Sequence, residues 1–218
     1  MASSSSPDPP GSLVAELRRF TTKRGPRRAG GAVAAADSTE RCDFCATGIP
    51  PEHRHMLDVE ERRIMCACEA CLVRQAGEAR YRPTGRRLLA LNAFQLSDET
   101  WGRFRIPIGL AFFFHSGSAG QVIALYPSPI GATESALDLE TWRALEDANP
   151  LLQSLEPDAE ALIVGRTVDP PQYFIAPIDE CYRLVGLIKS RWEGISGGTG
   201  AEAAIEEFFT TLRARAAA

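Results

Sequence analysis

The thirty positions from Cys42 to Cys71 constrain this chain most, because they hold five of its six cysteines. Cys42 and Cys45 form one Cys-x-x-Cys pair, and Cys68 and Cys71 form a second pair after a gap of 22 residues. A Cys-x-x-Cys pair at a tight turn presents two thiolates to one ion, and two such pairs complete a tetrahedral shell of four sulfurs. The spacing therefore predicts one metal ion bound by Cys42, Cys45, Cys68 and Cys71.

The nature of the ion follows from the donor set. Four thiolates suit both zinc and iron, and zinc is the commoner structural ion, so we expect zinc and keep iron as the alternative. The gap between the pairs is slightly longer than is usual for zinc ribbons. Residues 54–65 resemble strand material that could cover the site with Met56, Leu57, Val59, Ile64 and Met65. We therefore expect a zinc-ribbon-like module.

Three further residues near the module leave its ligand set open. Cys66 lies two positions before Cys68, on the same face if this stretch is a strand, and could replace Cys68 as ligand. It could equally remain a packed bystander, since free cysteines pack as small apolar residues, or serve redox chemistry or metal exchange. His53 and His55 could complete a mixed shell, although four cysteines already suffice.

The first residues and the hydropathy of the chain bear on where in the cell the protein is located. Its first residues lack a basic segment followed by an apolar run, so no secretory signal is expected. No stretch approaches the roughly 18 apolar residues of a membrane span. We therefore expect a cytoplasmic protein, and in a reducing compartment clustered cysteines indicate metal or redox chemistry more often than disulfides.

Composition divides the chain into three parts. Residues 1–40 are rich in Ser, Pro, Gly and Ala and predict a disordered basic arm with one short helix at 12–20. Residues 41–90 form the expected metal module, and residues 91–218 an α+β domain. Residues 96–180 carry 4 basic against 13 acidic side chains, so this body would repel nucleic acid and favours a protein partner. Within it, Glu156, Asp158 and Glu160 are expected to form a solvated loop.

The sequence after the module predicts the unit strand, strand, helix twice. The expected elements are a helix capped by Ser97 and ending near Trp101, strands at 105–116 and 121–126, a helix at 138–148, strands at 161–166 and 172–176, and helices at 179–192 and 201–215, the last opened by a capping box of Thr199 and Glu202. We expect a four-stranded antiparallel sheet with helices on one face, which is an α+β fold.

Other reactive side chains favour structural roles. His115 ends a run of three phenylalanines without a companion motif, and Cys181 falls on the apolar stripe of its helix. The glycines at 197–200 precede a helix but lack the strand and the Lys-Ser/Thr of a phosphate-binding loop. No catalytic residue is predicted, and we expect a protein that is not an enzyme.

Several long sequence words carry a resemblance to a known family. They are Arg-Cys-Asp-Phe-Cys at 41–45, Glu-His-Arg-His at 52–55, Cys-Ala-Cys-Glu-Ala-Cys at 66–71, Ile-Gly-Leu-Ala-Phe-Phe-Phe at 108–114, Tyr-Pro-Ser-Pro-Ile-Gly-Ala-Thr-Glu-Ser at 126–135, Pro-Ile-Asp-Glu-Cys-Tyr at 177–182 and the stretch 191–198. The chain resembles an uncharacterised bacterial family whose genes are often found among those for nickel-iron hydrogenases. The resemblance implies an accessory role whose partner is a hydrogenase subunit or maturation factor.

Three functional hypotheses follow. The first is a non-enzymatic metal-binding accessory protein that acts through protein–protein contacts, in which zinc supplies folding energy to a module with few apolar residues. The second is a rubredoxin-like electron carrier with iron in the same four thiolates. The third, disfavoured by the acidic body, is a nucleic-acid-binding regulator that uses the basic arm.

Overall fold

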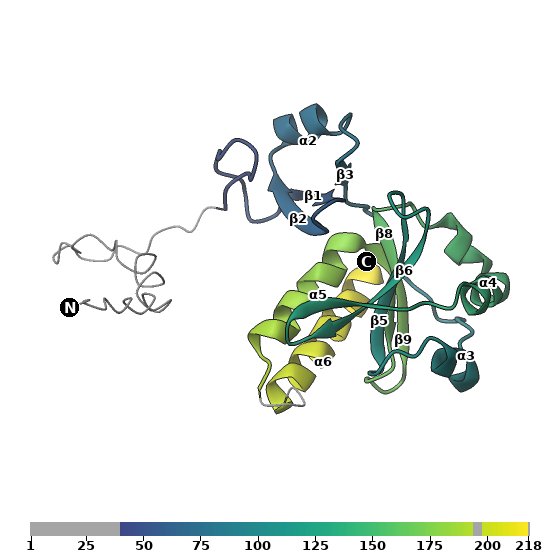
Figure 1. Ribbon diagram of the computed structural model, residues 1–218. Helices are drawn as coiled ribbons and strands as arrows, with labels where there is room; N and C mark the ends of the chain where they lie inside the picture. Colours follow the sequence, from purple (N-terminus) through teal and green to yellow (C-terminus); the bar gives the residue numbers. More distant parts are fainter. Residues whose placement is uncertain (1–39, 194–197, 218) are drawn as a thin grey trace, which may run out of the picture. The chain divides into compact units, whose positions relative to one another are not determined.

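The computed structural model describes residues 40–193 and 198–217 (Figure 1). Residues Thr39–Ala218 form one compact unit. The predicted basic arm and its helix at 12–20 lie outside the described residues. The cytoplasmic location also stays a prediction. Among the described helices, none combines the length and the apolar character that crossing a membrane requires.

A small antiparallel sheet begins the described chain. Its strands are β1 (Arg54–Asp58), β2 (Arg63–Ala67) and β3 (Tyr81–Pro83), in the order β2-β1-β3, and helix α2 (Glu69–Gln75) lies between β2 and β3 in the sequence. The β1–β2 turn is closed by Asp58, whose Oδ1 accepts hydrogen bonds from the amides of Glu60 and Glu61 at 3.2 and 3.1 Å. The strand material predicted at 54–65 is therefore a hairpin.

The second sheet has six strands and is larger than the predicted four. Its strands are β4 (Leu89–Ala90), β5 (Leu110–Ser116), β6 (Gln121–Ser128), β7 (Gly131–Ser135), β8 (Glu160–Gly165) and β9 (Gln172–Pro177), all antiparallel in the order β4-β9-β8-β5-β6-β7. The two edge strands were not predicted. β4 has only two residues, and β7 reads Gly-Ala-Thr-Glu-Ser, which has no apolar alternation. β4 lies before the predicted domain boundary at residue 90 but pairs with β9.

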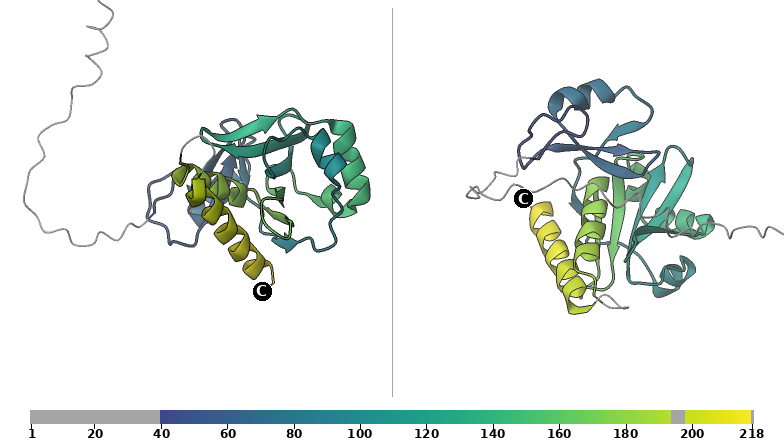
Figure 2. Two further views of the ribbon diagram at one scale, coloured as in Figure 1. Left: turned by 90° about the horizontal axis from the view of Figure 1, so that it is seen from below. Right: turned by 60° about the vertical axis from the view of Figure 1, so that its left-hand side comes forward.

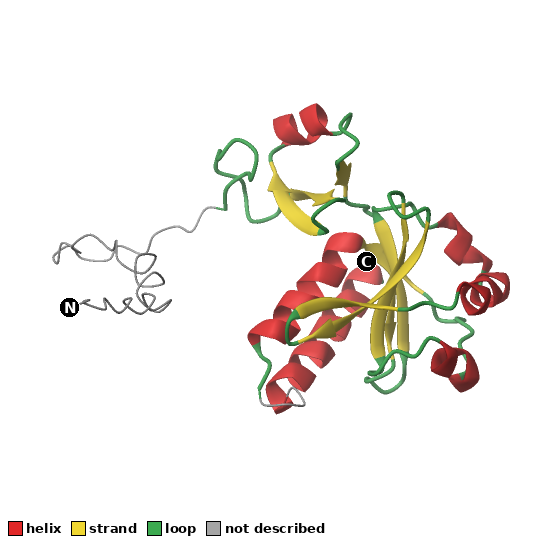
Figure 3. Cartoon of the chain, in the orientation of Figure 1, coloured by secondary structure: helices red, strands yellow, loops and turns green. Residues whose placement is uncertain are grey.

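Helices cover both faces of this sheet, so the prediction of helices on one face is wrong (Figure 3). α5 (Ile178–Ser190) and α6 (Gly198–Ala216) lie together on one face. α3 (Asp98–Arg103), α4 (Leu139–Ala148) and the 3₁₀ helix η2 (Pro150–Ser154) lie on the other (Figures 1 and 2). The second expected strand, strand, helix unit is present as β8, β9 and α5, whereas β7 intervenes before α4 in the first, and the helices of the two units pack on opposite faces.

Alternation along the central strand β5 explains the two layers. Leu110, Phe112 and Phe114 enter the core beneath α5 and α6, whereas Ala111 and Phe113 enter the core beneath α4. Successive side chains of a strand point to opposite faces, so a strand that is apolar at every position has to be covered on both sides. The residues of β8 are likewise all buried.

Two of the described helices, α3 and α4, begin at a residue whose side chain caps the helix. The Ser97 side chain accepts a hydrogen bond from the Thr100 amide, and the Asp138 side chain accepts one from the Glu140 amide, so α3 and α4 begin where the sequence predicts. The capping box predicted from Thr199 and Glu202 is wrong, because α6 already begins at Gly198.

Two of the three carboxylates of the predicted acidic loop, Asp158 and Glu160, are buried, whereas Glu156 is exposed. Asp158 is 5% exposed, and its Oδ2 accepts the Gly117 amide at 3.0 Å in the β5–β6 turn. Glu160 is also 5% exposed and pairs with Arg87, whose Nη2 donates to Oε2 at 2.6 Å and whose Nε donates to Oε1 at 3.2 Å. This pair anchors the segment between β3 and β4, so it fixes where the small sheet joins the large one.

Gly165 and Gly186 offer a matched test of the packing between β8 and α6. A Cβ at Gly165 would come within 2.3 Å of the Phe209 ring, whereas a Cβ at exposed Gly186 in α5 would meet nothing within 4 Å. We expect Gly165→Ala to lower the free energy of unfolding by about 1–3 kcal/mol through overpacking. Gly186→Ala should raise it by about 0.5–1 kcal/mol by helix propensity. Denaturant unfolding of both variants checks this, and a Gly165→Ala protein as stable as wild type would contradict the packing.

Candidate metal centre

The four predicted cysteines converge in space. One sulfur each from Cys42, Cys45, Cys68 and Cys71 lies within 4.8 Å of every other. The Sγ atoms of Cys45 and Cys68, which are 23 residues apart, are 3.7 Å from each other. Thiolates bound tetrahedrally to zinc at about 2.3 Å lie about 3.8 Å apart. The four side chains therefore fit one tetrahedral ion, and the four-thiolate set suits both zinc and iron.

The first pair sits in a tight turn, as predicted. The amide of Cys42 donates to the Thr47 carbonyl at 2.9 Å, and the amide of Ala46 donates to the Cys42 carbonyl at 2.8 Å. Ala46 has a φ of 59°, a left-handed conformation that ordinarily favours glycine, and its carbonyl accepts a hydrogen bond from Arg41 at 3.0 Å. The turn is thus closed by backbone bonds on both sides of Cys45.

The second pair sits at the start of a helix, where a ribbon would place a second strand turn. Cys68 is the N-cap residue of α2, and Cys71 is buried in its first turn. The Leu72 amide donates to the Cys68 carbonyl at 2.9 Å and so begins the helix. The order of the module is therefore turn, β1–β2 hairpin and helix, with one cysteine pair at each end.

Asp43 connects the first turn to the end of β2. Its amide donates to the Cys66 carbonyl at 2.9 Å, and its Oδ2 accepts from the Cys66 amide at 2.6 Å. Two bonds in opposite directions fix the turn of Cys42 and Cys45 against the strand that leads into Cys68. Asp43, in the middle of the Cys-Asp-Phe-Cys motif, thus fixes the positions of the two cysteine pairs relative to each other.

The apolar cover of the site differs from the prediction. Ile49 is buried beside Cys42 and Cys71, and Phe44 packs edge-on against Tyr81 with ring centroids 5.1 Å apart. None of the hairpin residues predicted to cover the site belongs to this cluster among the described residues. Leu57, Val59 and Ile64 belong instead to the core beneath α5 and α6. The hairpin therefore contributes its apolar side chains mainly to the body.

The cysteines of the cluster differ in pKa because their hydrogen bonds and burial differ. Hydrogen bonds from the side chain and amide of Thr47 lower the pKa of Cys45 to about 6. Burial, together with the neighbouring sulfurs, raises the pKa of Cys71 to about 12. At Cys42, burial acts to raise the pKa, but backbone amides of Cys68, Phe44 and Cys45 outweigh it and lower the pKa. Four thiolates this close need a cation between them before all four ionise.

Cys66 lies outside this cluster. It groups instead with His53 and His55, and one donor atom of each lies within 4.8 Å of the other two. The His55 Nδ1 is 2.8 Å from the Oδ2 of Asp179, 124 residues later in the chain. Sequence reasoning did not link Asp179 to these residues, since only the docking of β1 on α5 brings them together.

The two reactive residues judged structural have structural surroundings. Cys181 is fully buried on α5 among core residues, so the packing prediction is confirmed. His115 lies edge-on to Trp142, with its Nε2 3.4 Å from Glu146. Neither residue lies in the metal clusters of the described chain.

Comparisons with known proteins identify a family and no relative of known activity. Residues 41–216 match the model of a family of unknown function (DUF5947). No curated protein and no solved structure matches the chain. The match confirms the expected membership of an uncharacterised family, while the association with nickel-iron hydrogenase genes stays a prediction of the resemblance.

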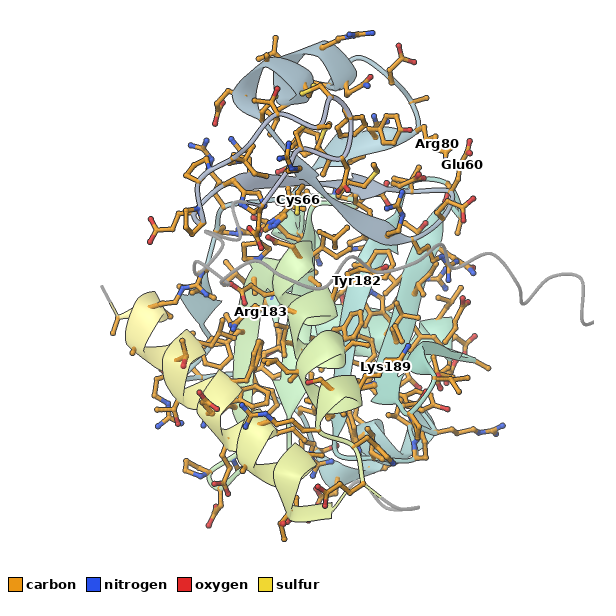
Figure 4. All side chains as sticks on the ribbon, turned by 90° about the vertical axis from the view of Figure 1, so that its left-hand side faces the viewer. Glu60, Cys66, Arg80, Tyr182, Arg183 and Lys189 are labelled. Atoms are coloured by element: carbon orange, nitrogen blue, oxygen red, sulfur yellow. The ribbon has the colours of Figure 1, made fainter. Side chains whose placement is uncertain are left out.

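Asp58 supports the hairpin that carries these side chains, and its charge predicts a pH dependence. It is 1% exposed, and its Oδ2 accepts hydrogen bonds from the Nε and Nη2 of Arg80 at 2.9 and 2.6 Å. Arg80 also lies 3.4 Å from Glu60 (Figure 4). The hydrogen bond from Arg80 lowers the pKa of Asp58 despite burial, so the charged form is the one that the fold stabilises.

We expect Asp58→Asn to lower the free energy of unfolding by about 1.5–3 kcal/mol at pH 7. Because the folded pKa lies below the unfolded value, the wild-type advantage should be complete above about pH 4 and vanish as the pH falls through the folded pKa. Denaturant unfolding of both proteins from pH 7 to pH 2.5 measures the difference between their free energies of unfolding. Acid releases metal from both proteins alike, so this release does not contribute to the difference. A difference that stayed constant with pH would contradict the role of the charge.

Proposed function

Because the chain belongs to DUF5947, a family of unknown function, we propose a function from the geometry of its own residues. The chain is a metal-binding accessory protein without enzymatic activity, in which one zinc ion bound by Cys42, Cys45, Cys68 and Cys71 stiffens a module that acts through protein contacts. The observation that carries the proposal is the convergence of the four sulfurs from two ends of the module.

The structural role of the ion follows from what the module lacks. Its own apolar cluster contains Cys42, Ile49 and Cys71 as buried residues, with Phe44 beside them. So small a core offsets little of the entropy of ordering the chain. A structural zinc supplies about 10–16 kcal/mol in comparable small modules, enough to hold the turn and helix α2 against the hairpin.

The module is joined firmly to the body, which supports a role in presenting a surface. Leu57 of β1 lies in the core beneath α5, and the Thr84 amide donates to the His55 carbonyl at 3.1 Å. The following residue, Gly85, donates to the Ala159 carbonyl at 2.9 Å. A rigid joint of this kind fixes the metal-bound turn relative to the sheet, so a partner can contact both at once.

The predicted partner is a subunit or maturation factor of a nickel-iron hydrogenase, and that assignment rests on the resemblance alone. The acidic composition of residues 96–180 favours a partner with a basic surface. The nucleic-acid alternative depends on the basic arm, which lies outside the described residues. The exposure of Cys45 supports the iron alternative, because a metal near the surface can exchange electrons with a partner.

Elemental analysis with an absorption spectrum, on protein purified without air and passed over a chelating resin, tests the site. We expect about one zinc per chain and no visible band. Cys68→Ser should lose this retained zinc and expose the module to proteolysis, because one of four ligands is gone. Cys66→Ser, two positions away, should keep it.

Each alternative gives a different result in this experiment. Iron with a visible band that dithionite bleaches would make the chain an electron carrier. Loss of the retained zinc in Cys66→Ser but not in Cys68→Ser would show that Cys66, in place of Cys68, is the fourth ligand. For the partner, a hydrogenase subunit should co-purify with wild type and not with the metal-free Cys68→Ser protein, and equal capture by both would contradict a metal-dependent contact.

A further inference from the structure

We propose that His53, His55 and Cys66 form a second metal site, which binds a divalent transition-metal ion such as zinc through two imidazoles and one thiolate and leaves one coordination position open. The three donor atoms lie within 4.8 Å of one another. Ligands of a tetrahedral zinc ion lie about 3.3–3.8 Å apart, so small side-chain rotations bring the three onto one ion. The three ligands of this site are distinct from those of the four-cysteine cluster, against which Cys66 packs.

Strand pairing places the three side chains on one face of the hairpin. His55 of β1 lies directly opposite Cys66 of β2 in the antiparallel register. Residues paired in this way have Cβ atoms about 4.5–5.5 Å apart and point to the same side. His53, two positions before His55, follows the same alternation, and the two rings lie 4.6 Å apart. Figure 4 shows Cys66 in the hairpin beside helix α5.

His55 has the partner that metal-binding histidines use. Its Nδ1 is 2.8 Å from the Oδ2 of Asp179, in the first turn of α5. An imidazole that donates from Nδ1 to a carboxylate is held in one orientation and presents the lone pair of Nε2 to a metal. A carboxylate in this position also raises the basicity of the ligating nitrogen.

The Nε2 atom of His53 is free to bind a metal ion. The His53 side chain is 6% exposed, and its Nδ1 lies 3.0 Å from the Pro50 carbonyl oxygen and 3.2 Å from the Oε2 of Glu40. A neutral ring that donates there leaves Nε2 as the acceptor, and this nitrogen is buried with no hydrogen-bond partner among the described residues. A buried polar atom of this kind costs free energy unless something binds it. A metal ion between His53 and Cys66 satisfies it.

The donor set indicates the class of ion and what it can do. Two imidazoles and one thiolate suit borderline ions such as zinc, whereas calcium and magnesium prefer oxygen ligands. Cys66 binds as the thiolate and releases its proton to solvent. Structural zinc sites have four protein ligands, whereas three protein ligands leave a position for water or an exogenous ligand. The second ion is therefore exchangeable, in contrast to the ion in the four-cysteine cluster.

Adding zinc back to the resin-treated protein tests the site. Zinc binding is measured by titration in competition with a chromophoric chelator, on the full chain without air. Wild type should take up one further zinc per chain beyond the retained one. Cys66→Ser and His55→Ala should each lose this added zinc and keep the retained zinc, and His53→Ala should behave in the same way.

Two further variants separate ligation from general damage. His115→Ala removes a histidine that lies outside both clusters, and it should bind the added zinc as wild type does. Asp179→Ala should weaken the added zinc by about 10–100-fold as a positioning residue, and Asp179→Asn, which can still accept from Nδ1, should recover part of the affinity. Thermal unfolding of each variant verifies that the fold is retained.

The outcomes distinguish this proposal from the proposed function. No added zinc in wild type, or equal uptake by wild type, Cys66→Ser and His55→Ala, would overturn the second site and leave the four-cysteine site untouched. Loss of the retained zinc in Cys66→Ser would assign Cys66 to the structural cluster instead. If a variant unfolds, the folded wild type still decides the point: cobalt added to the zinc-retaining protein should give thiolate-to-cobalt charge-transfer absorption, and its absence would exclude Cys66 as a ligand.

Discussion

Four cysteine sulfurs within 4.8 Å of one another set the constraint on which the N-terminal module depends. Two unit charges 4 Å apart near a protein surface repel by about 4 kcal/mol, so several thiolates cannot share this space alone. Within the chain itself, Thr47 favours the thiolate of Cys45, whereas burial, followed by the neighbouring sulfurs, disfavours that of Cys71. A divalent cation at the centre turns the repulsion into attraction. The backbone bonds of the turn and of Asp43 then need only hold the sulfurs in place.

The β1–β2 hairpin transmits this constraint to the rest of the molecule. One end of the hairpin is tied to the cysteine turn through Asp43, and the other is closed by Asp58 and Arg80. Between them, Leu57 enters the core beneath α5, and His55 reaches Asp179 on the same helix. The hairpin is therefore shared between the metal module and the body, and the module's own core is limited to the small cluster around Cys42, Ile49 and Cys71.

Sequence reasoning identified what local chemistry determines. The Ser97 cap, the central strands and the two Cys-x-x-Cys pairs depend on residues close together in the chain, and the two pairs do converge as predicted. The second helical layer was missed, although the continuous apolar runs of β5 and β8 indicate burial on both faces. Edge strands β4 and β7 carry no such signal, because one is very short and the other is polar. Asp158 and Glu160 read as a solvated loop because their partners, Gly117 and Arg87, are distant in sequence.

The choice between Cys66 and Cys68 as the metal ligand shows where the two-residue periodicity of a strand no longer predicts which side chains lie together. In a continuous strand the two side chains would share a face, and either could complete the cluster. β2 ends at Ala67, however, and Cys68 caps α2, so the chain changes direction between them. Cys68 then joins the sulfur cluster at the helix start, while Cys66 keeps the strand geometry and stays opposite His55. A single change of secondary structure thus gives two cysteines that are separated by one residue different neighbours, three other sulfurs for Cys68 and two imidazoles for Cys66.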